Sequence, residues 1–161
     1  MPLRLEPTVI AELEESLILC YTGRNHDSGV VHRDQKLQHQ NSDAVAAAAR
    51  QKEVTREIRR HLLRGQLLDC GRLIDEAWHT KRRLSPTISS HELDGIYELA
   101  KANGAVGGKL LGAGGGGYFI FFVRPFERYP LITALENKGL RCSRIAFEEN
   151  GLRTWKSRVK S

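Results

Sequence analysis

The chain contains a glycine run between Lys109 and Tyr118 that leads directly into apolar and aromatic residues. Gly114 to Gly117 are consecutive, and glycine loses more backbone freedom on folding than any other residue. Such a loop is retained where the backbone adopts positive φ, or where another group approaches it without meeting a Cβ. Its N–H groups can bind a phosphate, and Lys109 would add a positive charge. A wide turn between two strands is the alternative interpretation.

The residues after the run distinguish it from the two common nucleotide-binding loops. A Walker loop ends in Gly-Lys-Ser/Thr, and a dinucleotide fingerprint opens a helix. Here the glycines lead into Tyr-Phe-Ile-Phe-Phe-Val at 118–123, a pattern typical of a strand. The loop by itself therefore leaves phosphate binding and a structural turn both open.

Three adjacent cations, Lys81, Arg82 and Arg83, form a second candidate site. They stand at the predicted end of a helix, shortly before Ser85-Pro86, where a polar edge suits an anionic substrate. The alternative is a solvated helix end, because cations interact favourably with the C-terminal end of a helix dipole.

A third candidate is the polar segment 22–28, Thr-Gly-Arg-Asn-His-Asp-Ser, which follows a predicted buried strand. Arg24, Asp27 and Ser28 offer polar contacts, while the glycine and asparagine of the segment tolerate unusual backbone angles. A purely structural loop between a strand and a helix explains the same residues equally well.

The six histidines and three cysteines indicate no metal site. No histidine pair has the His-Glu-x-x-His spacing of a zinc protease, and Cys20, Cys70 and Cys142 are widely separated. We therefore predict no metal ligated by this chain. An odd number of separated cysteines also favours free thiols in a reducing cytoplasm.

The 161 residues suit one domain over 1–161, with 40% hydrophobic and 27% charged residues. The formal charge of +6 and the pI near 9.5 favour an anionic partner. The cations are spread along the chain without interleaved aromatics, so nucleic acid is the weakest candidate partner. No apolar run reaches membrane-spanning length, and the first residues lack the apolar core of a signal peptide. These features predict a cytoplasmic protein without a membrane span.

Hydrophobic periodicity predicts the elements that position these residues. Predicted helices cover 7–15, 30–64 in two pieces, 67–84, 90–103 and 125–138. Predicted strands cover 17–21, 106–111, 118–123, 140–147 and 152–155, and Asn150-Gly151 signals a type I′ turn before the last strand. This order predicts an α+β fold, with an antiparallel sheet and helices packed on one face.

Local signals add two expectations about the helices. Ser42 or Asp43 is expected to cap the second piece of the 30–64 helix. Trp78 belongs to an apolar stripe on the next helix, so it is expected in the core rather than as a platform for a cofactor.

The glycine run carries a family resemblance. Lys109-Leu-Leu-Gly-Ala-Gly-Gly-Gly-Gly-Tyr118 resembles the third motif of the GHMP kinases, and most of all their bacterial branch that phosphorylates D-glycero-D-manno-heptose 7-phosphate. Other segments resemble the same branch in the same order, so the resemblance runs from Pro2 to Trp155. They are Pro2-Leu-Arg-Leu5, 17–24 with Asp27-Ser28, 76–78 with 81–85, and Gly139-Leu-Arg141 with Phe147-Glu148.

The resemblance implies the second half of a two-domain kinase, folded as a ferredoxin-like plait. The family's first domain carries a Pro-x-x-x-Gly-Leu-Gly-Ser-Ser-Ala loop for ATP and usually a catalytic aspartate, and nothing in this sequence matches that loop. The expected partner is therefore the missing N-terminal kinase domain, in the same or a companion chain. ATP and Mg2+ would serve the complete enzyme, and neither is expected to bind tightly to this chain alone.

The resemblance also implies roles for the candidate residues, in an enzyme that transfers phosphate from ATP to O1 of a heptose 7-phosphate. The isolated chain is expected to be inactive and to supply no catalytic residue. The expected support for the ATP phosphates is Lys109, Gly112, Gly114, Gly115, Gly116 and Gly117; the expected contacts to the sugar phosphate are Lys81, Arg82, Arg83, Ser85, Arg24 and Ser28.

A non-catalytic module is the alternative from a different functional class. A kinase domain without its other half exposes apolar surface that was an interdomain contact, and such patches promote association. The alternative therefore predicts binding to another chain or formation of a homodimer.

Overall fold

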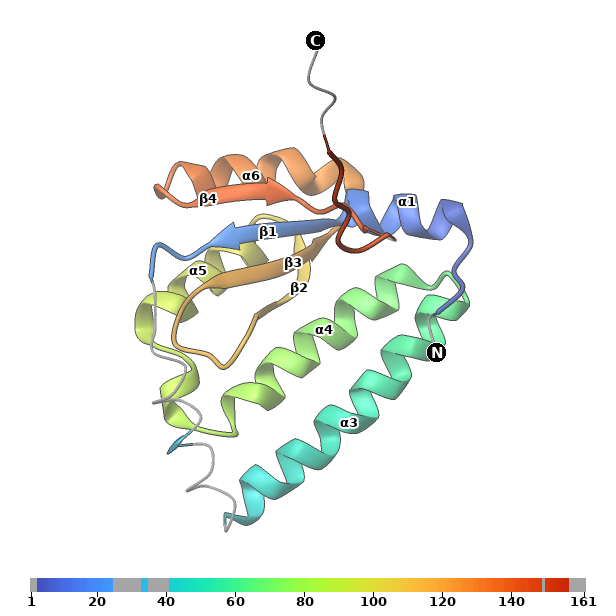
Figure 1. Ribbon diagram of the computed structural model, residues 1–161. Coiled ribbons are helices and arrows are strands. Elements are labelled where there is room, and N and C mark those ends of the chain that lie inside the picture. Colours follow the sequence, from blue (N-terminus) through green and yellow to red (C-terminus); the bar gives the residue numbers. More distant parts are fainter. Residues whose placement is uncertain (1–2, 25–32, 35–40, 149, 157–161) are drawn as a thin grey trace.

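The computed structural model describes residues 3–24, 33–34, 41–148 and 150–156. Its strands form one antiparallel sheet in the order β2-β3-β1-β4 (Figure 1). They are β1 (Leu17–Tyr21), β2 (Ala105–Leu110), β3 (Tyr118–Val123) and β4 (Arg141–Arg144). The helices are α1 (Pro7–Ser16), α3 (Ser42–Leu63), α4 (Leu67–Arg82), α5 (His91–Ala102) and α6 (Arg128–Glu136), with 3-10 turns η2 (Pro86–Ile88) and η3 (Pro125–Glu127). The predicted α+β fold with an antiparallel sheet is confirmed.

Strand β3 is the central apolar strand of the sheet. It pairs with β2 on one side and with β1 on the other, and its β-branched and aromatic residues suit a pleated surface that is covered on both faces. Phe119 and Phe121 point into one apolar cluster, whereas Phe122 belongs to a second cluster on the opposite face. The alternation follows the two-residue period of a strand.

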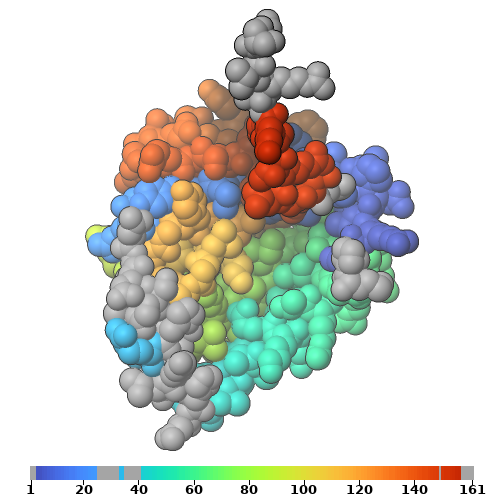
Figure 2. All heavy atoms as spheres, in the orientation of Figure 1, coloured from blue at the N-terminus to red at the C-terminus, as the bar shows by residue number. Residues whose placement is uncertain are grey.

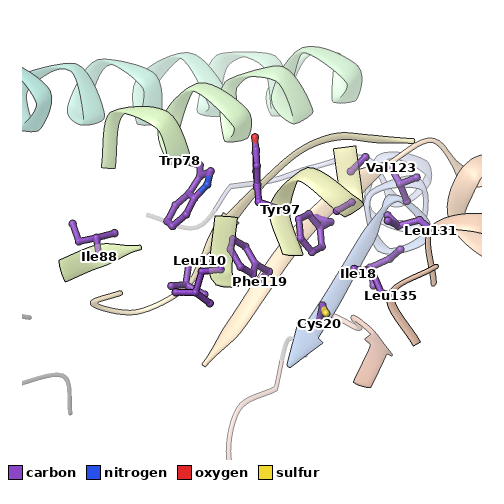
Figure 3. Packing of buried hydrophobic residues seen from close by; sticks show 14 residues of the cluster. Ile18, Cys20, Trp78, Ile88, Tyr97, Leu110, Phe119, Val123, Leu131 and Leu135 are labelled. Carbon is purple, nitrogen blue, oxygen red and sulfur yellow. The ribbon is translucent and has the colours of Figure 1, made fainter. Parts of the chain in front are cut away.

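The larger apolar cluster lies between the sheet and the helices α4, α5 and α6. Figure 3 shows Trp78, Tyr97 and Phe119 close together in this cluster, with Ile88 and Leu110 beside them. The Trp78 ring meets the Phe119 ring edge-on, with centroids 5.4 Å apart. Trp78 is fully buried, so its predicted place in the core is confirmed.

The helices are arranged around β2 and the back of the sheet. Figure 1 shows α5 and α6 behind the sheet, while α4 runs alongside β2 and α3 lies beyond α4. Arg50 joins the two long helices, because its Nη2 donates to Glu76 of α4 at 3.0 Å. Arg128 joins α6 to the end of α1 by donating to the carbonyl oxygen of Glu15 at 2.9 Å.

The cap of α3 differs from the sequence prediction. Asn41, rather than Ser42 or Asp43, is the N-cap residue, and its Oδ1 accepts a hydrogen bond from the N–H of Asp43 at 2.9 Å. Asparagine, aspartate and serine are all favourable N-cap residues, so the sequence did not determine which of the three begins the helix. The first piece of the predicted 30–64 helix falls mostly outside the described residues.

The predicted C-terminal hairpin is wrong. Strand β4 covers only Arg141–Arg144, and residues 152–155 form no strand among the described residues. Gly151 has the positive φ of 62° that the turn signal predicted, but Leu152 and Trp155 after it are 94% and 85% exposed. A strand forms only beside another strand whose backbone N–H and C=O groups are available for pairing. The turn signal at Asn150-Gly151 contains no information about such a neighbour.

Candidate functional site

The glycine loop, residues 111–117, joins β2 to β3 at one end of the sheet. The N–H of Leu111 donates to the carbonyl oxygen of Tyr118 at 2.8 Å and closes the base of the loop. Figure 2 shows the yellow and orange atoms of β2, the loop and β3 on the viewed face, between the blue of β1 and the green of α4. Three segments from distant parts of the sequence hold the loop in place.

The first is the 3-10 turn η2, whose last residue is Ile88. The N–H of Gly115 donates to the carbonyl oxygen of Ile88 at 2.9 Å. Gly114 has a φ of 130°, and a Cβ at this residue would lie 2.9 Å from the Cα of Ile88. Glycine is required here both by the backbone angle and by the close approach of η2. The close approach that the glycine run predicted is therefore made by another part of the chain.

The second segment is the end of β1. The N–H of Gly117 donates to the carbonyl oxygen of Arg24, and the carbonyl oxygen of Gly117 accepts from both the N–H and the Oγ1 of Thr22, each at 2.9 Å. A Cβ at Gly116 would lie 2.9 Å from the Arg24 carbonyl oxygen. The N–H groups of Gly115 and Gly117 are therefore used inside the domain and are not available to a ligand.

The third segment is the end of α4, which contributes Lys81. Its Nζ donates to the carbonyl oxygen of Leu110 at 3.0 Å and to that of Gly112 at 2.6 Å, so it bridges the end of β2 and the start of the loop. The side chain is buried, in contrast to the solvated helix end considered from the sequence. Burial, together with the positive charge of Lys109, lowers the pKa of Lys81 to about 8.

Lys109 lies on β2, opposite Ile120 of β3, and is half-buried. Burial lowers its pKa as well. In the described part of the chain it has no hydrogen-bond or ion-pair partner, and the pKa of Lys81 shows that the two charges interact. Two desolvated cations, neither of which pairs with a carboxylate of the described residues, give this end of the glycine loop a positive potential that favours an anion.

The remaining predicted cations have different surroundings. Arg82 pairs with Asp94 at 2.9 Å and lies over the Trp78 ring, 5.9 Å from its centroid. Arg83 is exposed and has no partner within the described ranges. Arg24 forms an ion pair with Glu92 through its half-exposed side chain.

Ser85 is buried and supports η2. Its Oγ accepts a hydrogen bond from the N–H of Thr87 at 3.1 Å and donates to the carboxylate of Asp34. Because η2 carries the Ile88 carbonyl that binds the loop, Ser85 acts on the loop through this turn. The prediction for Ser28 lies outside the described residues.

The sequence did not identify Ile88 or Asp34 as part of this arrangement. Ile88 contributes a main-chain carbonyl, and because every residue has one, the residue type gives no signal. Asp34 is 51 residues from Ser85 along the chain. Thr22 could have been identified from the sequence, since it begins the polar segment 22–28 that was the third candidate site.

The described residues carry no group of three or more His, Cys, Asp or Glu side chains arranged to hold a metal ion. Among the helices that the structure describes, none combines the length and apolar character needed to cross a bilayer.

Comparison with known proteins gives a consistent set of relatives. Residues 58–140 match the family model described as GHMP kinases C terminal. The chain is 31% identical over 157 residues to a D-glycero-alpha-D-manno-heptose 7-phosphate kinase from Campylobacter jejuni, and 29% identical over 131 residues to a bifunctional fucokinase/GDP-fucose pyrophosphorylase from Arabidopsis thaliana. These matches cover 96% and 80% of this chain, but 46% and 12% of the respective relatives.

Among solved structures, the mevalonate kinase of L. major in complex with R-mevalonate superposes with a TM-score of 0.69 at 25% identity. The match covers 76% of this chain and 38% of that one. The chain therefore spans less than half the length of these relatives.

Proposed function

The chain belongs to the GHMP kinase family through its C-terminal domain, and from this premise we propose that it supplies the C-terminal half of an ATP-dependent sugar kinase. The observation that carries the proposal is the glycine loop, which three separate segments hold beside two lysine charges that form no ion pair among the described residues. Phosphoryl transfer depends mainly on positioning and on stabilising charge. A loop held by three segments positions the phosphates, and the lysines beside it stabilise their negative charge. Neither role requires a catalytic acid or a catalytic base.

In this proposal the loop supports the phosphates of ATP. Lys109 is the cation that pairs with them, because its charge has no partner in the described part of the domain. The N–H groups of Gly112, Gly114 and Gly116 form no hydrogen bond among the described residues and could donate to a phosphate oxygen. Gly114, Gly115 and Gly117 shape the loop, and Lys81 holds it in place.

The proposed acceptor is O1 of a heptose 7-phosphate. The 31% identity to a heptose 7-phosphate kinase over nearly the whole chain supports this choice, while the match to a fucokinase makes fucose the competing substrate. Arg83 is the proposed ligand of the sugar phosphate, since it is exposed at the end of α4 and unpaired within the described residues. Arg82 and Arg24 already pair with carboxylates and would contribute only by exchanging partners, whereas Ser85 acts through η2.

Magnesium would enter with ATP and be held chiefly by phosphate oxygens and by the other half of the enzyme. The donor set described here fits this arrangement, because it offers cations and N–H groups to a phosphate and no cluster of oxygen ligands to a metal. We propose that the other half also carries the Pro-x-x-x-Gly-Leu-Gly-Ser-Ser loop, and that this chain alone does not turn over substrate.

The DNA immediately upstream of the reading frame tests the proposal. We expect an in-frame continuation or an adjacent gene that encodes the Pro-x-x-x-Gly-Leu-Gly-Ser-Ser loop. Coexpression of the two parts should then release ADP with D-glycero-D-manno-heptose 7-phosphate, and less efficiently with L-fucose. If neither arrangement is found, the kinase assignment reduces to common ancestry.

Self-association is the second candidate function. Phe126 of η3 and Tyr129 of α6 are 98% and 79% exposed, and exposed aromatic residues are typical of contact surfaces. Size-exclusion chromatography with light scattering should give a dimer mass at micromolar concentration if this function dominates. A monomer mass at all concentrations would exclude it.

A further inference from the structure

Cys20 and Cys142 face each other across two neighbouring strands. They are direct partners in the antiparallel register of β1 and β4. Opposite residues in such pairs have Cα atoms about 4.5–5.5 Å apart and side chains on the same face of the sheet. Disulfides form between Cα atoms about 4.4–6.8 Å apart, a range that includes the separation of opposite residues.

The two thiols already interact, and they differ in exposure. Both cysteines are free, and the Cys20 Sγ lies 4.0 Å from the carbonyl oxygen of Tyr21. The interaction between the two neighbouring thiols lowers the pKa of Cys142 and raises the pKa of Cys20. Cys20 is fully buried at the margin of the core (Figure 3), whereas Cys142 on the edge strand is partly exposed. Cys142 is therefore the thiol that a small oxidant reaches first.

We propose that Cys20 and Cys142 form an oxidation site at which hydrogen peroxide converts the two thiols into a cross-strand disulfide. The Cys142 thiolate attacks the peroxide, the O–O bond breaks, and a sulfenic acid and one water form after proton uptake. The Cys20 thiol then attacks the sulfenic sulfur, the S–S bond forms, and the S–O bond breaks with release of a second water. One peroxide is reduced and the thiol pair is oxidised, so atoms and electrons balance.

The position of the pair links this reaction to the glycine loop. Strand β1 continues from Cys20 through Tyr21 to Thr22, which accounts for two of the hydrogen bonds to Gly117. Strand β4 has only four residues and lies at the edge of the sheet. A disulfide would fasten this short edge strand to the strand that holds the loop.

The chain provides its own matched control. Cys70 is buried in α4, and its Sγ lies 3.8 Å from the carbonyl oxygen of Ile58, away from the pair. Cys70→Ser should therefore leave the reaction intact. Cys142→Ser should abolish the disulfide, and Cys20→Ser should stop at a sulfenic acid on Cys142 that dimedone traps.

The test treats the folded chain with hydrogen peroxide, alkylates the remaining thiols and maps the peptides by mass spectrometry without reduction. The expected product has lost two hydrogens and contains one peptide pair joined through Cys20 and Cys142, both in the wild type and in Cys70→Ser. Dithiothreitol should restore both thiols. A disulfide that uses Cys70, a linkage only between chains, or alkylated Cys20 and Cys142 after treatment of folded Cys70→Ser would overturn the proposal.

Discussion

The ammonium group of Lys81 lies 2.6 Å from the carbonyl oxygen of Gly112, 31 residues further along the chain. A second bond, to the carbonyl oxygen of Leu110, makes Lys81 a bridge between α4 and both sides of the point where β2 becomes the glycine loop. Hydrogen bonds that involve a charged group are stronger than neutral ones. The position of the loop therefore depends on a residue that lies outside it.

Replacing Lys81 by methionine should loosen the loop. The substitution keeps an unbranched side chain but removes both hydrogen bonds, each of which contributes about 1.5–3 kcal/mol when one partner is charged. Amide exchange at Leu111 and Gly115, measured by NMR, should become faster by about tenfold or more. Lys52→Met, at an exposed residue of α3, is the matched control and should leave these rates unchanged. Equal rates in the two variants would show that Lys81 does not hold the loop.

The free energy of unfolding should depend on pH through the titration of Lys81. Its pKa is about 8 in the folded chain, against 10.5 for an ordinary lysine, because burial disfavours the charged form. Between these two values the unfolded chain binds the proton more tightly, so the free energy of unfolding rises with pH. Relative to Lys81→Met, urea denaturation should show a gain of up to about 3 kcal/mol from below pH 8 toward pH 10.5. A constant difference, or one that shrinks, contradicts the lowered pKa.

Gly114→Ala should destabilise the domain. The new Cβ would lie 2.9 Å from the Cα of Ile88, and alanine would have to adopt a φ of 130°. Strain of this kind costs about 1–3 kcal/mol, which denaturant unfolding resolves. Gly95→Ala is the control, because Gly95 is exposed within α5 and its Cβ would meet nothing within 4 Å. This second change should stabilise the domain by up to about 1 kcal/mol; the same sign for both variants would refute the packing argument.

Lys109→Met tests the proposed phosphate contact in the complete kinase. Loss of a charged hydrogen bond to a phosphate should raise KM for ATP, or lower kcat/KM, by about tenfold to a hundredfold. The unfolding free energy should not fall, because the Lys109 ammonium group has no partner among the described residues and its desolvated charge is removed. Lys52→Met serves again as the control for the loss of one positive charge. Unaltered kinetics in Lys109→Met would remove Lys109 from the site.

The sequence was sufficient for the elements whose signals are local. The apolar runs predicted β1 and β3, and the glycine run predicted the connection between β2 and β3. The glycine run also predicted that another group approaches the loop closely. At Gly114 this group is Ile88 of the same chain.

The sequence was insufficient where a residue's role depends on a distant partner. Helical spacing places Lys81, unlike the exposed Arg83, on the face of Trp78, but it does not show that the carbonyl oxygens of Leu110 and Gly112 become the partners of Lys81. Only the packing of α4 along β2 turns its side chain into the protein. The predicted strand at 152–155 failed for the same reason, since pairing depends on an available neighbour and not on the turn signal at Asn150-Gly151.

The most direct test of the kinase assignment is a coupled ADP-release assay on three samples: this chain, the polypeptide that carries the Pro-x-x-x-Gly-Leu-Gly-Ser-Ser loop, and both together. With ATP, Mg2+ and D-glycero-D-manno-heptose 7-phosphate, we expect turnover only when both are present, with the phosphate added at O1 as read by phosphorus NMR. Turnover by this chain alone, or no turnover by a stable complex of the two folded parts, would contradict the account.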